Sequence, residues 1–308
     1  LSKRLIGNTP VMREMLEIVE RIAPTDSTVL VMGESGTGKE LIARAIHEES
    51  HRREGQFVAV NCSAFTEGLL ESELFGHVRG SFTGAVEDRK GVFLSADGGT
   101  LFLDEVADMS HATQVRILRA LEDRKVIPVG GDQELATDVR IIAATNKDLA
   151  EQVRLGRFRE DLFYRLNVIP IHLPPLRERM EDLPLLAGHF LRRHCQRMKK
   201  SITGLSQEAW QSLRQHHWPG NVRELENVIQ RQVALARTER IDRIEIEQVS
   251  SSSQVDDPAH GSARVNSILV DEDTLKTQLP PGGCDLEERL VALEKDFILQ
   301  ALERTDGN

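Results

Sequence analysis

A glycine-rich heptapeptide near the start of the chain has the residue types that bind phosphate. The sequence GESGTGK occupies residues 33–39, directly after the β-branched run TVLVM and directly before a helical pattern. In that context the backbone N–H groups of the loop and of the helix N-terminus point at phosphate oxygens, and Lys39 reaches the β and γ oxygens. The alternative, a chance glycine turn, is disfavoured by this strand–loop–helix context. The residues expected around the phosphates are Gly33, Glu34, Ser35, Gly36, Thr37, Gly38, Lys39 and Glu40.

A second apolar segment ends in two acidic residues. In GGTLFLDEV, a strand predicted at residues 100–103 is followed by Asp104 and Glu105. Glu40 replaces the Ser or Thr that usually follows the P-loop lysine, so Mg²⁺ must be held largely by other groups. We expect Asp104 to position Mg²⁺ through its water ligands and Glu105 to orient and deprotonate an attacking water. A merely solvated carboxylate pair is the alternative.

Two further patterns could suggest metal chemistry. HEESH at residues 47–51 places two histidines four residues apart with a glutamate between them, the spacing of a helical zinc site. We favour ordinary positions over zinc, because the segment is the polar end of a helix and no third ligand is evident. Cys62, Cys195 and Cys284 are scattered and have neither metal-type spacing nor a disulfide pattern, which fits a reducing cytoplasm.

The segment GHVRGSFTGA, residues 76–85, carries an aromatic residue at the tip of a glycine-rich stretch. Its glycines favour turns and positive φ, so we predict a mobile surface loop presenting Phe82 and Thr83. The alternative is a Phe82 side chain that folds back onto the domain, since single exposed apolar residues are ordinary.

Strand and helix patterns alternate in the first part of the chain. Helical spacing of apolar residues spans residues 8–21 and 112–121, and the P-loop opens a further helix. Besides the strand before the P-loop, strands are predicted at residues 57–60, 100–103, 126–129, 139–143 and 168–171. This alternation predicts an α/β fold with a parallel sheet covered by helices on both faces.

The character of the sequence changes after LPPLRER. Helices are predicted at residues 183–193, 207–215 and 221–236 with no good strand between them, which indicates a small all-helical domain. Residues 250–283 are rich in Ser, Pro, Gly and Asp and should form a linker. An amphipathic helix is predicted at residues 285–304; its apolar stripe needs a further domain or another subunit to cover it.

Composition excludes several classes of protein. The 308 residues are 40% hydrophobic and 29% charged, and no apolar run approaches the roughly 18 residues of a membrane span. We therefore expect a globular cytoplasmic protein without a membrane partner. The net charge of −10 argues against nucleic-acid binding through bulk electrostatics.

These motifs together resemble the AAA+ ATPase domain of bacterial enhancer-binding proteins, the NtrC-like activators of sigma-54 RNA polymerase. The resemblance covers about residues 5 to 245. ESELFGHVRGSFTGA is similar to the signature loop of the family, normally written GAFTGA, with Ser81 in place of the first Ala. The Lys-Glu ending of the P-loop is also similar to the family's own. The loop residues that the resemblance assigns to sigma-54 are Gly80, Ser81, Phe82, Thr83, Gly84 and Ala85.

The resemblance also implies roles for residues outside these motifs. Asn61 would hold Glu105 inactive, and Thr145 with Asn146 would form the sensor I element close to the γ-phosphate. Arg159 and Arg165 would act in trans on the ATP of a neighbouring subunit, where a guanidinium stabilises developing phosphoryl charge. Further nucleotide contacts are expected from sensor II Arg223 in the lid and from Ile6 and Gly7.

The resemblance implies an ATPase, using ATP and Mg²⁺, that forms a hexameric or heptameric ring and remodels the sigma-54 closed complex to open promoter DNA. The expected domains are an AAA+ α/β subdomain at residues 1–174, a helical lid at 175–249, a linker at 250–284, and the first helix of a truncated Fis-like DNA-binding domain at 285–308. Enhancer DNA would be bound by the intact protein and weakly or not at all by this chain.

Two alternatives stay open at this point. The chain could be another AAA+ remodelling machine that grips a different target, although the Phe-Thr-Gly-Ala run argues for the sigma-54 group. It could also be a DNA-binding regulator whose nucleotide site only controls oligomerisation.

Overall fold

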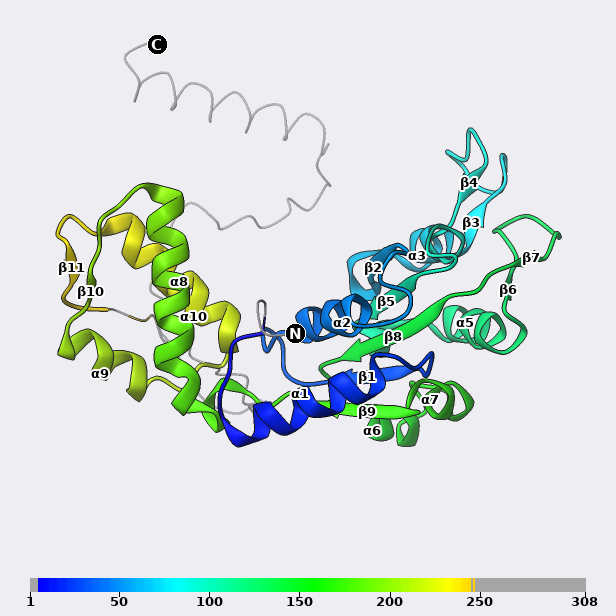
Figure 1. The fold of residues 1–308 in the computed structure, drawn as a ribbon. Coiled ribbons are helices and arrows are strands. Elements are labelled where there is room, and N and C mark those ends of the chain that lie inside the picture. Colours follow the sequence, from blue (N-terminus) through cyan, green and yellow to red (C-terminus); the bar gives the residue numbers. More distant parts are fainter. Residues whose placement is uncertain (1–4, 245, 247–308) are drawn as a thin grey trace, which may run out of the picture. The chain divides into compact units, whose positions relative to one another are not determined.

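The computed structural model describes residues 5–244 and residue 246 (Figure 1). The chain separates into two compact units, Leu1–Gln248 and Val249–Asn308, and the described residues all belong to the first. The linker predicted at residues 250–284 and the helix predicted at 285–304 lie outside the described residues. No helix within the described ranges combines the length and apolar character needed to cross a membrane.

A five-stranded parallel sheet organises the first part of the chain (Figure 1). Its strand order is β2-β5-β8-β1-β9, and each adjacent pair is parallel. The predicted α/β class is therefore confirmed. The strands are β1 (Val29–Met32), β2 (Phe57–Asn61), β5 (Thr100–Asp104), β8 (Arg140–Thr145) and β9 (Ile169–His172).

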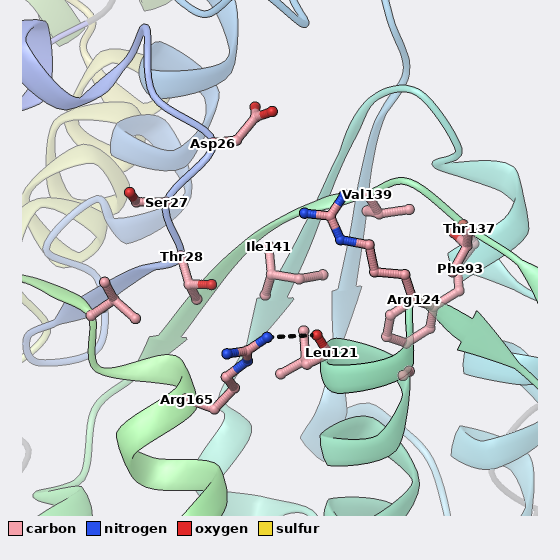
Figure 2. A pocket seen from close by; sticks show the side chains of 12 residues that line it. Asp26, Ser27, Thr28, Phe93, Leu121, Arg124, Thr137, Val139, Ile141 and Arg165 are labelled. Carbon is pink, nitrogen blue, oxygen red and sulfur yellow. Dashed lines mark hydrogen bonds between the residues drawn. The ribbon is translucent and has the colours of Figure 1, made fainter.

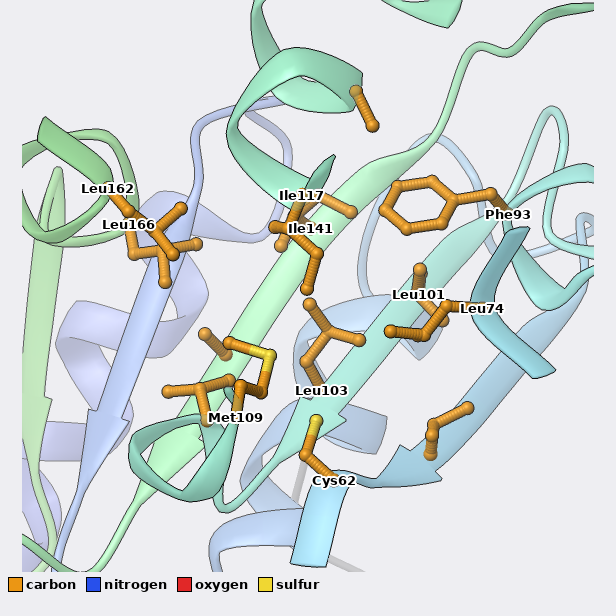
Figure 3. Close-up of a cluster of buried hydrophobic side chains, with 14 of the residues drawn as sticks. Cys62, Leu74, Phe93, Leu101, Leu103, Met109, Ile117, Ile141, Leu162 and Leu166 are labelled. Atoms are coloured by element: carbon orange, nitrogen blue, oxygen red, sulfur yellow. The ribbon is translucent and has the colours of Figure 1, made fainter. Parts of the chain in front are cut away.

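Helices cover both faces of this sheet because the three central strands, β5, β8 and β1, carry buried apolar residues on both faces. In β5, Leu101 and Leu103 belong to one buried cluster, shown in Figure 3, and Phe102 belongs to the other. The first cluster is completed by α3 (Glu67–Phe75), α4 (Val92–Ser95), α5 (His111–Asp123), α6 (Leu149–Arg154) and α7 (Glu160–Leu166). The second is completed by α1 (Pro10–Ile22) and α2 (Lys39–Glu48). Short 3-10 turns, η1 (Cys62–Ala64) and η2 (Val106–Asp108), follow β2 and β5.

Two small antiparallel hairpins lie side by side outside the main sheet (Figure 1). The first pairs β3 (Gly76–His77) with β4 (Arg89–Lys90), and the second pairs β6 (Lys125–Val126) with β7 (Leu135–Ala136). They are joined where Val78 N donates to Val129 O at 3.1 Å. The prediction that residues 126–129 form a strand of the parallel sheet was wrong, because Pro128 cannot donate a ladder hydrogen bond and the segment turns into a hairpin.

The region after residue 175 forms a helical lid with its own core. Two 3-10 turns, η3 (Leu176–Glu178) and η4 (Met180–Asp182), lead into α8 (Leu183–Met198), α9 (Gln207–Gln215) and α10 (Asn221–Leu235). Trp218 is fully buried in the lid cluster, and its Nε1 donates to Leu213 O at 3.0 Å. The expectation of an all-helical lid was wrong in one detail: β10 (Gly204–Leu205) and β11 (Arg240–Ile241) pair in parallel. Strands of two residues are too short to show a sequence period.

Candidate functional site

The P-loop is observed in the predicted setting between β1 and α2. Gly36 and Gly38 have φ of 78° and 109°, which side chains other than glycine rarely adopt. A Cβ on Gly36 would also lie 2.3 Å from Gly220 O, so the loop passes directly against the lid. Lys39 is the first residue of α2, and its Nζ donates to Gly33 O at 3.0 Å. The free N–H groups at this helix start can bind phosphate.

Glu40 does not face the P-loop lysine. Its Oε1 accepts from Arg44 Nε at 3.0 Å and from Arg44 Nη2 at 2.7 Å on the exposed side of α2. This geometry agrees with the expectation that oxygen ligands for Mg²⁺ must come from elsewhere.

The acidic pair lies at the carboxyl end of β5, and β8 separates that strand from β1. Glu105 has a φ of 53°. Its Oε1 is 3.5 Å from Lys39 Nζ, and its Oε2 accepts from Asn146 N at 3.1 Å. Burial, followed by the neighbouring Glu105 charge, raises the pKa of Asp104.

The donor set fits Mg²⁺ bound together with phosphates. Asp104 carries a half-buried carboxylate whose raised pKa reflects a negative charge that its surroundings do not fully compensate. Such a carboxylate suits Mg²⁺, which uses one or two carboxylates and takes its other ligands from water and substrate phosphates.

The predicted sensor I residues contact both motifs. Thr145 is buried at the end of β8, and its carbonyl accepts from Gly33 N of the P-loop at 3.2 Å. The next residue, Asn146, donates its backbone N–H to Glu105. One strand end therefore links the P-loop to the carboxylate expected to activate water.

Asn61 lies at the end of the neighbouring strand, in register with Asp104. Its Oδ1 accepts from Ser63 N at 2.9 Å and from Ser63 Oγ at 2.7 Å. Glu105 instead contacts Lys39 and Asn146. The partnership of Asn61 with Glu105 stays a prediction.

The two predicted trans arginines lie on α7 and its N-cap. Arg159 forms an exposed ion pair with Asp161 at 2.6 Å. Figure 2 shows Arg165 donating through Nη2 to Leu121 O, at 3.0 Å, in a pocket of about 240 Å³ that Arg124 also lines. Thr28, just before β1, lines the same pocket, so Arg165 lies at the amino edge of the sheet. The P-loop and Glu105 lie at the carboxyl edge.

The surface loop connects β3 to β4. Phe82 is 39% exposed, and its ring packs edge-on against His77 with centroids 5.0 Å apart. Thr83 is exposed and Ala85 is buried, whereas a Cβ added to Gly80 or Gly84 would meet nothing within 4 Å. The tip is thus an open turn in which Phe82 folds partly back. Its position is intermediate between the two alternatives, a side chain presented at the surface and one packed onto the domain.

The lid contacts the P-loop through residues that sequence reasoning partly missed. Arg223 Nη1 lies 3.4 Å from Ser35 Oγ of the P-loop, and its role as sensor II stays a prediction. Arg177 forms a two-bonded ion pair with Glu34, at 2.6 and 2.8 Å, and Asn221 Nδ2 donates to Glu34 Oε2 at 3.0 Å. These bonds, the one from Arg177 first, lower the pKa of Glu34. Arg177 belongs to the segment LPPLRER, which was interpreted only as a domain boundary in the sequence.

Asp182 is a second residue that the sequence did not single out. Its buried carboxylate accepts from Asn8 N at 2.6 Å, from Thr9 N at 3.1 Å and from Thr9 Oγ1 at 2.9 Å. Ile6 packs against the lid cluster, and a Cβ on Gly7 would come within 3.0 Å of Asp182 Oδ2. The segment predicted to contact the nucleotide is therefore anchored to the start of the lid.

Fold and site together define a P-loop nucleotide-binding domain with a helical lid. A model of the Sigma-54 interaction domain matches residues 5–172, and a model of the AAA+ ATPase lid domain matches residues 177–263. The chain belongs to the Sigma-54 interaction domain family, as the sequence motifs predicted.

Named relatives agree with this assignment. The chain is 48% identical over 304 residues to the transcriptional regulatory protein ZraR of Klebsiella oxytoca, covering 99% of this chain and 64% of that protein. It is 45% identical over 316 residues to the DNA-binding transcriptional regulator NtrC of Rhizobium meliloti (strain 1021), covering 99% and 65%. It thus spans less than two thirds of each of these relatives.

Solved structures of NtrX from Brucella abortus, in complex with ADP and with ATP, match with a TM-score of 0.72 and 40% identity. They cover 78% of this chain, which in turn covers 53% and 52% of those chains.

Proposed function

We propose that this chain is an ATP-hydrolysing transcriptional activator that forms a ring and remodels the sigma-54 RNA polymerase closed complex to open promoter DNA. The observation that carries the proposal is the placement of Glu105 between Lys39 and Asn146, at the sheet edge that the P-loop also occupies. Membership of the Sigma-54 interaction domain family supports the choice of partner.

In the proposed reaction the P-loop N–H groups and Lys39 bind the phosphates of ATP. Asp104 would hold Mg²⁺, which would supply positive charge to the phosphates. In the structure, Lys39 lies within reach of both Gly33 O and Glu105. When phosphate oxygens attract Lys39, Glu105 loses that contact and is free to accept a proton from the attacking water.

The position of Arg165 supports the proposed assembly. Because a strand rises about 3.3 Å per residue, the six residues of β8 separate the amino edge from the P-loop edge by far more than an ion-pair distance. This distance supports a role for Arg165 on the nucleotide of another subunit rather than on its own. We propose that Arg159 and Arg165 do so in a homo-oligomeric ring, a hexamer or a heptamer.

The surface loop is the proposed contact with sigma-54, through Phe82 and Thr83. Asn61 and Glu105 would connect the state of the γ-phosphate to the position of the loop, so that the contact surface is populated in one nucleotide state. We also propose a cytoplasmic location, and enhancer DNA binding by the intact protein with weak or no binding by this chain. Residues 285–308 would begin a Fis-like domain.

The runner-up proposals make different predictions. Another AAA+ remodelling ATPase would hydrolyse ATP but would not bind sigma-54. A DNA-binding regulator that uses nucleotide only to control oligomerisation would bind ATP without turnover.

Phosphate release measured over a range of protein concentrations tests the proposal. Specific activity should rise with concentration, because each site needs a neighbouring arginine. Lys39→Ala should abolish ATP binding, whereas Glu105→Gln should bind ATP without hydrolysing it. The ATPase assignment is wrong if the wild-type chain shows no turnover at any concentration, or if Lys39→Ala binds ATP as tightly as wild type.

A further inference from the structure

The side chain of Asn221 joins three separate segments of the chain. Asn221 is the first residue of α10 and is fully buried. Its Oδ1 accepts from Leu176 N at 2.8 Å, and its Nδ2 donates to Ser35 O and to Glu34 Oε2, both at 3.0 Å. One amide therefore ties the P-loop to the entry and to the last long helix of the lid.

The backbone next to Asn221 extends this connection. Val222 N and Arg223 N both donate to Gly36 O, at 3.0 and 3.2 Å. The N-terminal N–H groups of a helix have no partner within the helix. Here two of these N–H groups donate to the carbonyl of Gly36 in the P-loop. The lid therefore binds a carbonyl oxygen of the loop, and the N–H groups of the loop remain available to phosphate.

The conformation of Asn221 explains why this residue type suits the position. Its φ is 53°, in the left-handed region that Asn and Gly tolerate best. Its amide also offers a donor and an acceptor at once, as the contacts to Ser35 and Leu176 require. Asp would keep the acceptor and lose the donor, and Gly would keep the backbone and lose both.

We propose that Asn221 is a positioning residue that sets the P-loop in its phosphate-binding conformation and couples that conformation to the docked lid. The inference rests on the ATPase function proposed above. Without the amide, the carbonyls of Ser35 and Gly36 are held less firmly, and ATP must order the loop when it binds. Asn221 therefore acts on nucleotide affinity more than on the chemical step.

The first test removes the amide and keeps the backbone. Asn221→Gly should raise the dissociation constant for ATP about tenfold, because two partly buried hydrogen bonds to the P-loop are lost. Its kcat at saturating ATP should stay within about threefold of wild type, since bound ATP then orders the loop. Isothermal titration calorimetry with ATP and a phosphate-release assay measure the two quantities.

Ser206→Gly provides the matched control. Ser206 is a buried N-cap residue in the same lid, and its Oγ accepts from Ala209 N at 3.1 Å. This substitution also removes a buried polar group at a helix start, but the hydrogen bonds of the Ser206 hydroxyl, to Ala209 N and Asp242 O, lie within the lid. It should lower the thermal unfolding midpoint and leave the dissociation constant for ATP unchanged.

A second pair of variants exchanges donor and acceptor. Asn221→Asp places a carboxylate against Glu34 Oε2 and Ser35 O, and should weaken ATP binding more than Asn221→Gly does. Adding Glu34→Gln supplies an amide donor opposite the new carboxylate and should recover much of the lost affinity. This pair decides the question if Asn221→Gly does not fold.

The outcomes separate this inference from the function on which it rests. Failure of wild-type protein to bind ATP would remove the proposed function itself. If wild type binds ATP, the inference is overturned when Asn221→Gly keeps the wild-type dissociation constant, when Ser206→Gly loses the same affinity, or when Glu34→Gln gives no recovery in the Asn221→Asp background.

Discussion

Replacing Phe82 with alanine should separate ATP hydrolysis from the contact with sigma-54. Phe82 is 39% exposed and its described aromatic partner is His77, whereas Phe93 is 1% exposed inside the main core cluster. The two residues have the same side chain in opposite environments. They therefore form a matched pair for deciding whether the loop aromatic serves stability or recognition.

The expected stability effects differ severalfold. An aromatic pair contributes about 0.5–1.5 kcal/mol, so Phe82→Ala should cost about 1 kcal/mol and lower the unfolding midpoint by about 2–4 °C. Phe93→Ala empties a fully buried site and should cost about 3–5 kcal/mol. Thermal unfolding followed by circular dichroism measures both.

Although Phe82→Ala should change stability little, it should have a large effect on the contact with sigma-54. Phe82 contacts His77 rather than the P-loop, so Phe82→Ala should assemble and keep most of its ATPase activity. It should lose stable binding to purified sigma-54 in the presence of ADP and a metal fluoride. Co-sedimentation and phosphate release are measured on the same preparations. Equal proportional loss of both activities, or a stability cost as large as that of Phe93→Ala, would refute the assignment of the loop as a contact surface.

Three further predictions concern the ring, the loop and pH. Arg165→Ala should reduce turnover on the order of 10³-fold, and mixing it with Glu105→Gln should restore some phosphate release; no recovery at any ratio would exclude action in trans. Ser81 Oγ is buried without a hydrogen-bond partner among the described residues, so Ser81→Ala should stabilise the loop by about 1 kcal/mol; faster proteolysis of the loop would contradict this. Contacts with Arg177 and Asn221 lower the pKa of Glu34 below its ordinary 4.5, so the Glu34 carboxylate stabilises the fold above pH 4.5 and that contribution is lost as pH falls through the lowered value. Glu34→Gln should accordingly lower the unfolding midpoint at pH 7, and a difference that persists unchanged at pH 3 would contradict the assignment.

Features that depend on local physics could be predicted from the amino-acid sequence alone. A P-loop binds phosphate with N–H groups of consecutive residues, so GESGTGK between a strand and a helix was enough to predict it. The same holds for the acidic pair after a strand and for all five strands of the sheet, whose apolar runs carry the signal. The two-residue strands of the hairpins and the lid have no such period. Residues 126–129 were misassigned because Pro128, which cannot donate a ladder hydrogen bond, interrupts the apolar run.

Tertiary structure decided which of these local features meet. The order β5-β8-β1 brings Glu105 to Lys39 and Asn146, and the lid returns Asn221 to the P-loop across 186 residues of sequence. No spacing rule predicts such contacts, because they depend on strand order and on the close approach of Gly36 to Gly220. The side-chain amide of Asn221 and the carboxylate of Asp182 look like ordinary polar residues in the sequence; burial in the folded chain, where each must find partners, makes them structural connections.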